Sequence, residues 1–325
     1  MADHLFVWDY MTDFALYLLP FPNYRVWADN IHFFIDHHTV GLFEQGDYQA
    51  ATGDFVQMRA WVVAKLLWNP SLDQRELMKE FITGYYAPEL VPIYLAYFDL
   101  LADRFETLGT PLGIFRNTAF DWVDLDTLNK ATELQEKALT TATELEKKDP
   151  EKFAGLVFKV RRERIPLDLV RLMNYDDYAF TATATGQPLL GPKRSEMKGL
   201  AEDFAARLDA SGVTQQAEWA SAEVFANFKQ NFIDRYAVAV VDAPVPDVAR
   251  DSAAGRWADY QEMNCQISHQ DEWAFLEADA DASNGAAVRM PANHQEWAVN
   301  ASFGTLTGIL TDKFGSDQIP TGSTV

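Results

Sequence analysis

The stretch VGLFEQGDY, residues 40–48, passes from a short apolar run directly into a carboxylate, an amide, a glycine and a second carboxylate. An apolar run of this length is typical of a buried strand. Upstream, the apolar run HLFVWDY, residues 4–10, also ends in polar and aromatic side chains. We therefore interpret both segments as strands whose ends carry the chemistry of the protein.

Each of these strands is followed by a segment with helical periodicity. In residues 26–38, six side chains lie close to one stripe of a helix: Val26, Trp27, Asn30, Ile31, Phe34 and Ile35. Residues 55–68 predict the next helix, with Asp54 as its N-cap. The order strand, helix, strand, helix predicts two parallel strands joined by a crossover helix.

The sequence pattern changes twice after these elements. Residues 72–236 predict a helical bundle, built from segments 72–86, 88–108, 124–148, 150–180, 193–211 and 217–236. Pro166 is expected to kink or divide the fourth of these segments. After residue 236, short strands and turns predict a β-rich, sandwich-like module that buries Trp273 and Trp297. The predicted domains are residues 1–70, 71–236 and 237–325.

Composition excludes several classes of function. The 325 residues carry a formal charge of −21, which argues against binding to a phosphate backbone and so against a nucleic-acid partner. A single cysteine, Cys265, excludes an intrachain disulfide and a multi-cysteine zinc site. His32, His37 and His38 do not have the spacing of a metal-binding pair on one helical face. We expect no metal, no cofactor and no membrane span, because no apolar run is long enough to cross a bilayer.

The ends of the two predicted strands form the candidate site. In parallel βα architectures, functional side chains gather where the strands end. The polar and aromatic residues there are Trp8, Asp9, Tyr10, Glu44, Gln45 and Tyr48. Carboxylates and amides bind sugar hydroxyls, and Trp and Tyr offer a flat apolar surface to the sugar ring. In the alternative reading, Glu44 and Asp47 cap a helix or pair with a base, while Trp8 and Tyr10 belong to the core.

Two carboxylates could also act as a catalytic pair. If the strands are neighbours, Asp9 and Glu44 approach the separation of about 5–10 Å that glycosidases use. Alternation along the second strand places Glu44 and Gln45 on opposite faces. Spacing alone does not decide which of the two faces the site.

Several motifs together carry a family resemblance. They are the Trp-x-Tyr strand end (residues 8–10), the Pro-Phe-Pro-Asn turn (residues 20–23), the Glu-Gln-Gly strand end (residues 44–46) and the Lys-Leu-Leu-Trp-x-Pro helix end (residues 65–70). With the segments around them, they resemble the bacterial domain of unknown function 4838, which is linked to glycoside hydrolase family 163. The resemblance covers residues 5–105 closely and the later helices more loosely.

This resemblance implies a retaining endo-β-N-acetylglucosaminidase acting on N-glycans, with the substrate's acetamido group as nucleophile. It implies an α/β fold in which this chain supplies the last two βα units of a (β/α)₈ TIM-type barrel, followed by the helical region. A secreted, periplasmic or cell-surface location follows from the same resemblance. The substrate-binding residues it indicates are Trp8, Asp9, Tyr10, Asn23, Glu44, Gln45 and Tyr48. The catalytic acid is expected on an earlier strand, outside this chain.

A complete barrel of this kind needs about 250 residues, yet only about 70 residues precede the helical region here. The chain is therefore expected to be the C-terminal part of a larger enzyme, to self-associate through an incomplete barrel, and to hydrolyse no glycan by itself. The alternative is a non-catalytic carbohydrate-binding or scaffold protein that has kept the sugar-contacting strand ends.

Overall fold

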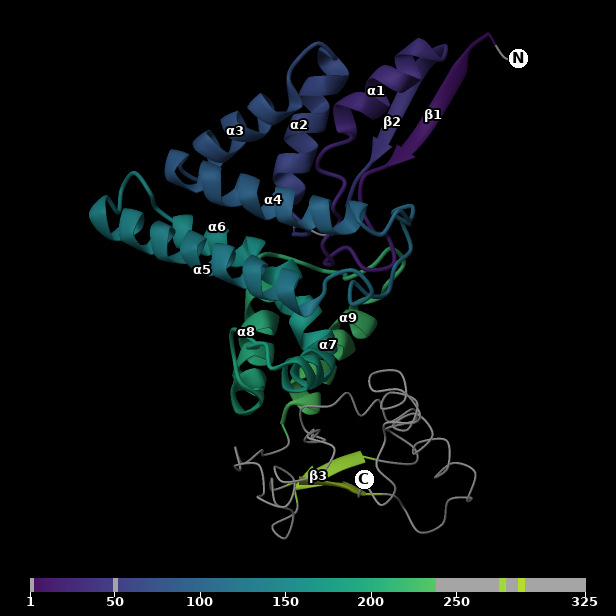
Figure 1. Cartoon of the computed structure of the whole chain (residues 1–325). Helices are drawn as coiled ribbons and strands as arrows, with labels where there is room; N and C mark the ends of the chain where they lie inside the picture. Colours follow the sequence, from purple (N-terminus) through teal and green to yellow (C-terminus); the bar gives the residue numbers. More distant parts are fainter. Residues whose placement is uncertain (1–2, 49–51, 238–274, 279–285, 290–325) are drawn as a thin grey trace, which may run out of the picture. The chain divides into compact units, whose positions relative to one another are not determined.

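The computed structural model describes residues 3–48, 52–237, 275–278 and 286–289 (Figure 1). The chain divides into two compact units. The first unit comprises Met1–Met173 and Glu202–Asn231, and the second comprises Asn174–Ala201 and Phe232–Val325. All of the predicted site residues lie in the first unit.

The two N-terminal strands pair in parallel. β1 (Leu5–Tyr10) and β2 (Thr39–Gln45) lie side by side and point the same way, with Trp8 opposite Phe43 and Asp9 opposite Glu44 (Figure 1). Helix α1 (Trp27–Asp36) connects them and packs on β2. These elements confirm the predicted parallel pair with its crossover helix.

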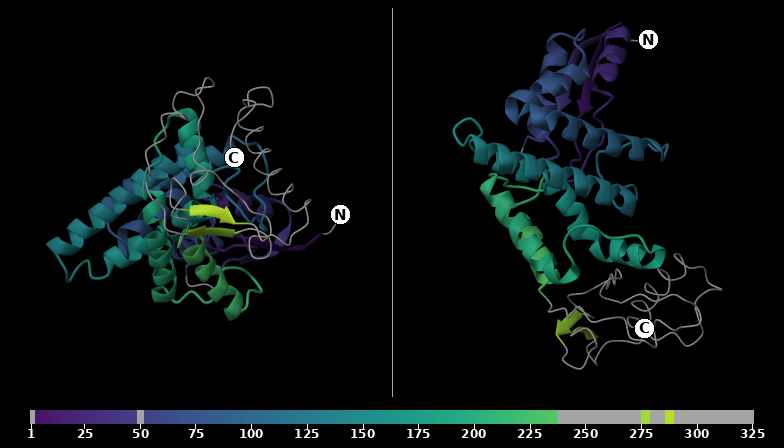
Figure 2. Two further views of the ribbon diagram at one scale, coloured as in Figure 1. Left: turned by 90° about the horizontal axis from the view of Figure 1, so that it is seen from below. Right: turned by 60° about the vertical axis from the view of Figure 1, so that its left-hand side comes forward.

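Helices make up most of the remaining described chain. They are α2 (Val56–Trp68), α3 (Gln74–Tyr85), α4 (Val91–Glu106), α5 (Leu125–Lys148), α6 (Leu156–Glu163), α7 (Ile165–Thr185), α8 (Met197–Ala210) and α9 (Ala222–Arg235). Two short 3₁₀ turns cover Pro88–Leu90 and Arg194–Glu196. α4 packs along α5, and α5 packs along α6 (Figure 2).

Several helix ends follow rules that are readable in the sequence. The side chains of Asp73 and Asp124 cap α3 and α5 by accepting hydrogen bonds from backbone N–H groups in the first turn. α6 and α7 are separate helices that meet at Arg164, and Pro166 lies in the first turn of α7, where it is tolerated. The expected division at Pro166 is therefore observed.

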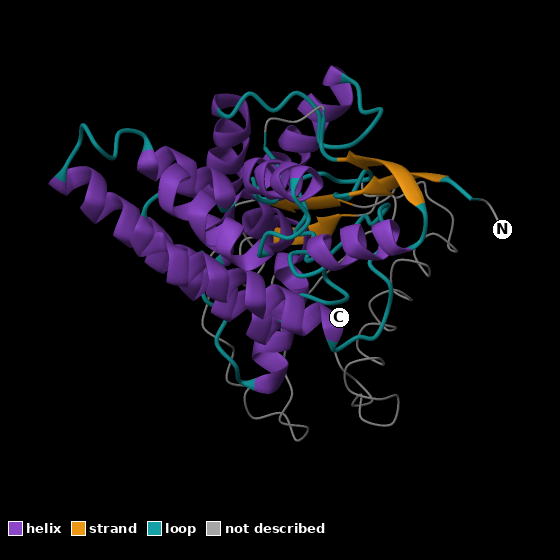
Figure 3. Cartoon of the chain, turned by 90° about the horizontal axis from the view of Figure 1, so that it is seen from above, coloured by secondary structure: helices purple, strands orange, loops and turns teal. Residues whose placement is uncertain are grey.

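The predicted barrel is wrong. Among the described residues, the parallel sheet contains only β1 and β2, and helices dominate the chain (Figure 3). Closing a barrel of this type takes eight strands, and a local βα pattern specifies only the pairing of neighbouring segments. Consistent with an unclosed sheet, Phe6 and Val40 are exposed to solvent.

The predicted β-rich C-terminal module is also not observed. In the described part of residues 237–325, the strands are β3 (Phe275–Ala278) and β4 (Ala286–Arg289), which form one antiparallel pair. Trp273 and Trp297 lie outside the described residues. Turn-forming sequence between short apolar runs predicts a hairpin well, but it does not specify a second sheet for that hairpin to pack against.

Aromatic side chains form the centre of the first unit. Phe98 lies 4.6 Å from both Tyr24 and Phe55, measured between ring centroids, and Phe55 lies 5.0 Å from Tyr94. All four rings are almost fully buried. Edge-to-face and tilted pairs of this kind add to the free energy gained from burial. The core therefore joins the loop before α1 to α2 and α4.

A buried ion pair holds the loop after β1 against α2. The Nη2 atom of Arg59 lies 2.6 Å from the Oδ2 atom of Asp54, and the two residues are only 5% and 4% exposed. The same carboxylate accepts a hydrogen bond of 2.9 Å from the backbone N–H of Phe21 and another from the Tyr24 hydroxyl. Burial and the neighbouring Asp54 carboxylate raise the pKa of Tyr24 well above its ordinary value.

Asp54 consequently does not cap α2, contrary to the prediction. α2 begins at Val56, and its N-cap residue is Phe55, in the left-handed region with φ of 52°. Arg59 donates to the carbonyl oxygens of Phe21 and Asp54 and to Oδ1 of Asn23. The carboxylate of Asp54 is therefore used as the acceptor at the centre of a buried network instead of as a cap.

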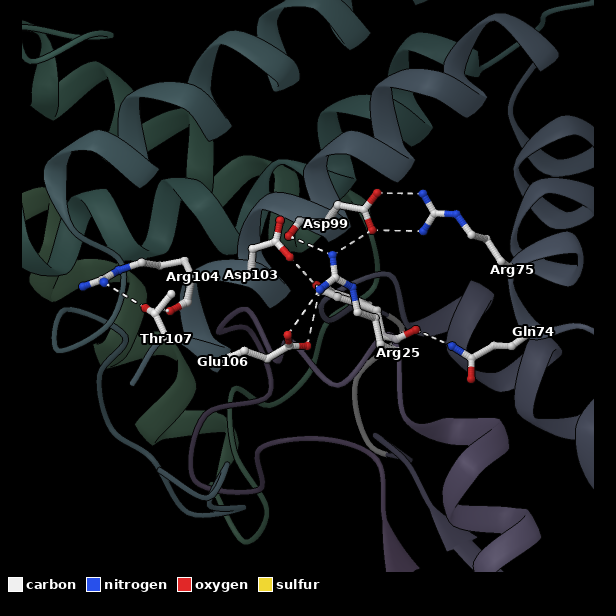
Figure 4. A network of polar contacts seen from close by, with 9 residues as sticks. Arg25, Gln74, Arg75, Asp99, Asp103, Arg104, Glu106 and Thr107 are labelled. Atoms are coloured by element: carbon white, nitrogen blue, oxygen red, sulfur yellow. Dashed lines mark hydrogen bonds and ion pairs between the residues drawn. The ribbon is translucent and has the colours of Figure 1, made fainter. Parts of the chain in front are cut away.

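A second polar network lies at the surface. Arg25 and Arg75 share the carboxylate of Asp99, with N···O distances of 3.1 and 2.6 Å (Figure 4). Arg25 also lies 2.6 Å from Asp103 on α4 (Figure 4). Hydrogen bonds from Arg75, and then those from Arg25, lower the pKa of Asp99 against the opposing effect of burial. This network links α3 and the loop before α1 to α4, but water reaches it.

We expect Arg59→Met to destabilise the protein by about 3–5 kcal/mol, because it leaves the buried Asp54 carboxylate without its partner. Arg75→Met, in the exposed network, is the matched control and should cost about 1 kcal/mol or less. Urea denaturation, followed by circular dichroism, measures the free energy of unfolding of both variants. Equal losses for the two variants would contradict a central role for the Asp54–Arg59 pair.

Candidate functional site

The two parallel strands end at the same edge of the sheet, and after β1 the chain continues directly into a buried loop. The backbone N–H of Met11 donates to the carbonyl oxygen of Gln45 at 2.9 Å, which extends the pairing one residue past β1. Residues 16–22 are buried, so they hold the strand ends in place. The ends of β1 and β2, at Tyr10 and Gln45, are therefore joined to each other and to a buried loop.

One face of the sheet presents aromatic side chains, and we call Phe6, Trp8, Tyr10 and Phe43 the aromatic face. Trp8 and Phe43 meet edge to face with ring centroids 4.8 Å apart, and they are 61% and 54% exposed. The ring of Phe6 lies over Gly41, where an added Cβ atom would come within 2.4 Å of it. The alternative that Trp8 and Tyr10 belong to the core does not hold, because both are exposed.

Gln45 lies on the same side as the aromatic face. The indole Nε1 of Trp8 donates a hydrogen bond of 2.7 Å to Oε1 of Gln45. Since side chains alternate along β2, Glu44 lies on the opposite side, as Asp9 does on β1. The structure thereby resolves what spacing left open: Gln45 accompanies the tryptophan, and Glu44 accompanies Asp9.

A carboxylate from a distant part of the sequence completes the polar groups beside the aromatic face. Oε1 of Glu218 accepts hydrogen bonds of 3.3 Å from both the Gln45 amide and the Tyr48 hydroxyl. We call Gln45, Tyr48 and Glu218 the polar rim. Glu218 was not predicted from the sequence, and no local pattern indicates its role, because 170 residues separate it from Tyr48.

Backbone hydrogen bonds fix the loop that carries Glu218. The N–H of Glu218 donates to the carbonyl oxygen of Phe14 at 2.9 Å, and the N–H of Tyr17 donates to that of Gln216 at 2.8 Å. The loop between α8 and α9 is thus paired with the loop after β1. The position of the Glu218 carboxylate is therefore set by main-chain contacts and not only by its own side-chain bonds.

Asp13 anchors a third loop to the same region. Its buried Oδ1 accepts hydrogen bonds of 3.0 Å from the backbone N–H groups of Ala15 and Arg116. Burial raises the pKa of Asp13 to about 6, against the opposing effect of these hydrogen bonds. The carboxylate therefore ties the loop before α5 to the loop after β1. Asp13, like Glu218, was not predicted from the sequence.

The opposite side of the strand ends carries the two carboxylates. Burial, and after it the nearby Asp9 carboxylate, raise the pKa of Glu44 from its ordinary value of 4.5 to about 7. The Oε2 atom of Glu44 is buried and has no hydrogen-bond partner among the described residues. Asp9 accepts a hydrogen bond of 2.9 Å from the N–H of Tyr10. The alternative that Glu44 pairs with a base is not supported by any described contact.

Asn23 is placed differently from the other predicted residues. Its Oδ1 accepts a hydrogen bond from Arg59, inside the network around Asp54. No described hydrogen bond joins it to the strand-end residues at positions 8–10 or 44–48. Its observed contact is therefore structural.

No metal or membrane feature accompanies this site. Within the described ranges, no group of three or more His, Cys, Asp or Glu side chains is arranged to hold a metal ion. Likewise, no helix in the described part of the chain combines the length and apolarity needed to cross a bilayer.

Comparison with known proteins bears on the N-terminal part of the chain. No curated protein and no solved structure matches this sequence. A family model does match, and it covers β1, β2 and helices α1 to α3, with every residue of the site except Glu218. Residues 1–99 match the model described as a domain of unknown function, DUF4838, which confirms the resemblance to that domain but not its link to glycoside hydrolase family 163.

Proposed function

We propose that the strand-end site binds a carbohydrate, with the aromatic face against a sugar ring and the polar rim against its hydroxyl groups. The observation that carries this proposal is the orientation of Trp8. Its ring is largely exposed, yet the hydrogen bond to Gln45 and the contact with Phe43 hold it in one position. A fixed, solvent-facing indole is a ready-made stacking surface for a flat apolar ligand face.

The polar rim suits the hydroxyl groups of such a ligand. The Gln45 amide, the Tyr48 hydroxyl and the Glu218 carboxylate provide both donors and acceptors within one hydrogen-bonded row. An exposed apolar patch edged by polar groups is typical of a binding surface. The charge of −21 disfavours anionic ligands, so a neutral glycan fits better. By the family resemblance, we expect a glycan that contains N-acetylglucosamine.

A second candidate function is glycoside hydrolysis at the Asp9–Glu44 side. The specific observation is the pKa of Glu44, which burial raises to about 7 beside a second carboxylate. Two carboxyl groups whose environments differ in this way are the usual acid and partner of glycosidases. In this proposal Glu44 donates a proton to the leaving oxygen, Asp9 acts as its charged partner, and the substrate's acetamido group is the nucleophile. A non-catalytic binding protein is the alternative.

We expect Trp8→Ala to weaken binding of N,N′-diacetylchitobiose by about tenfold or more, because it removes the stacking surface. Trp68→Ala is the matched control, since Trp68 is 90% exposed at the end of α2 and has no contact with the site. Isothermal titration calorimetry measures both affinities. Unchanged binding in Trp8→Ala, or an equal loss in both variants, would overturn the proposal.

The raised pKa of Glu44 predicts how stability depends on pH. The folded state favours the protonated carboxyl of Glu44. The stability that this group contributes is therefore fully present below pH 4.5 and is lost as the pH rises to about 7. Glu44→Gln stays neutral. It should therefore match the wild type at pH 4.5 and exceed it in stability at pH 8, as measured by urea denaturation. A stability difference between the two proteins that stays constant from pH 4.5 to pH 8 would contradict this account of Glu44.

A hydrolysis assay distinguishes the two candidate functions. If Glu44 is the acid, Glu44→Gln should lower turnover of a chitobiose-containing N-glycan by about 10²- to 10⁴-fold while binding is retained. A substrate with an activated leaving group should then recover most of the rate. Absence of turnover by the wild type, together with Trp8-dependent binding, would leave the non-catalytic function.

A further inference from the structure

We infer that Phe115 and Trp219 form a second sugar-binding position, so that the ligand is a neutral oligosaccharide longer than a disaccharide. This inference rests on the proposed carbohydrate-binding function and extends it. It concerns two residues that lie outside the matched family region and far from the strand ends in the sequence.

Phe115 and Trp219 form a stacked aromatic pair that is exposed to solvent. Trp219 is 76% exposed and Phe115 is 57% exposed. Their planes are within 20° of parallel, with centroids 6.4 Å apart. The other aromatic pairs at the strand ends meet edge to face, at 72° for Trp8 with Phe43 and 83° for Tyr10 with Phe14. Because both rings remain largely exposed, the outer side of this stack is open to a ligand.

The backbone at Trp219 is strained. Its φ of 66° lies in the left-handed region, which a bulky side chain rarely adopts. Phe55 shares this conformation, but its ring is fully buried in the core, which offsets the strain. Trp219 gains little from burial. Residues whose backbone strain is not offset by packing are found mainly at binding sites.

The loop is braced so that Trp219 keeps this position. The N–H of Ala220 donates to the carbonyl oxygen of Ala217 at 3.2 Å, and the side chain of Gln215 donates to the carbonyl oxygen of Ala220. The N–H of Glu218 donates to the carbonyl oxygen of Phe14, in the loop after β1. The exposed indole is thus held by main-chain bonds on both sides.

Two chains of contacts connect this surface to the aromatic face. Hydrogen bonds run from Trp8 to Gln45 and on to Glu218, the residue before Trp219. Ring contacts run from Tyr10 to Phe14 at 5.6 Å and from Phe14 to Phe115 at 6.2 Å. The polar rim is therefore linked to both aromatic surfaces. Two stacking surfaces joined by hydroxyl-binding groups match separate rings of one neutral oligosaccharide.

Calorimetry of the whole chain with N-acetylglucosamine oligomers, from the disaccharide to the hexasaccharide, tests this inference. The wild-type affinity should rise with oligomer length. Trp219→Ala should lower the affinity for the hexasaccharide by about tenfold and leave that for the disaccharide within about twofold. Trp68→Ala should reproduce the wild-type series.

A stability measurement distinguishes loss of a binding group from loss of the fold. Trp219→Gly relieves the strained backbone and removes little buried surface, so its Tm should equal or exceed that of the wild type while its affinity for the hexasaccharide falls. A lower Tm would overturn the interpretation of Trp219 as a strained binding residue.

The results that would contradict the second sugar-binding position differ from those that would contradict the proposed function. Binding that depends on Trp8 but keeps its length dependence in Trp219→Ala would overturn the second position and leave the proposed function intact. Absence of sugar binding by the wild type, or binding that is insensitive to Trp8→Ala, would overturn both. An equal loss for every oligomer in Trp219→Ala would place Trp219 in the first position and contradict a separate second one.

Discussion

The buried ion pair of Asp54 and Arg59 determines how the loop after β1 meets the helix after β2. Two charges removed from water are stable only when other groups satisfy their remaining hydrogen-bonding capacity. Here the backbone N–H of Phe21 and the hydroxyl of Tyr24 donate to Oδ2 of Asp54, and Oδ1 of Asn23 accepts from Arg59. The Pro-Phe-Pro-Asn turn is thereby attached to the N-terminus of α2, and the aromatic core around Phe98 packs against the same loop.

The strand-end region depends on this attachment. The loop after β1 contributes Phe14 and Tyr17, whose backbones pair with the loop between α8 and α9. The same loop contributes Asp13, which holds the backbone of Arg116. Three loops from different parts of the sequence are therefore fixed around one sheet of two strands. A sheet this small has little stability of its own, so the surrounding helices and loops must supply it.

Local patterns predicted the order of β1, α1, β2 and α2 well, because periodicity and capping act over a few residues. The barrel was predicted wrongly, because closure depends on strands that local patterns do not specify. Asp54 was predicted as a cap, and its real partners include Phe21, 33 residues away. Alternation showed that Glu44 and Gln45 face opposite ways, but only the contact between Trp8 and Gln45 assigned the faces. Glu218, Phe115 and Trp219 reach the site through tertiary contacts alone.

The hydrogen bond between Tyr48 and Glu218 has a consequence for the order of folding. Contacts between residues so far apart in sequence form only after the intervening chain has paid a large loss of conformational entropy. β1, α1 and β2 span a much shorter stretch of chain, whereas the polar rim closes only when the loop between α8 and α9 has packed against the loop after β1. The rim is thus expected to form late, and a substitution that displaces the loop between α8 and α9 should disturb the rim directly.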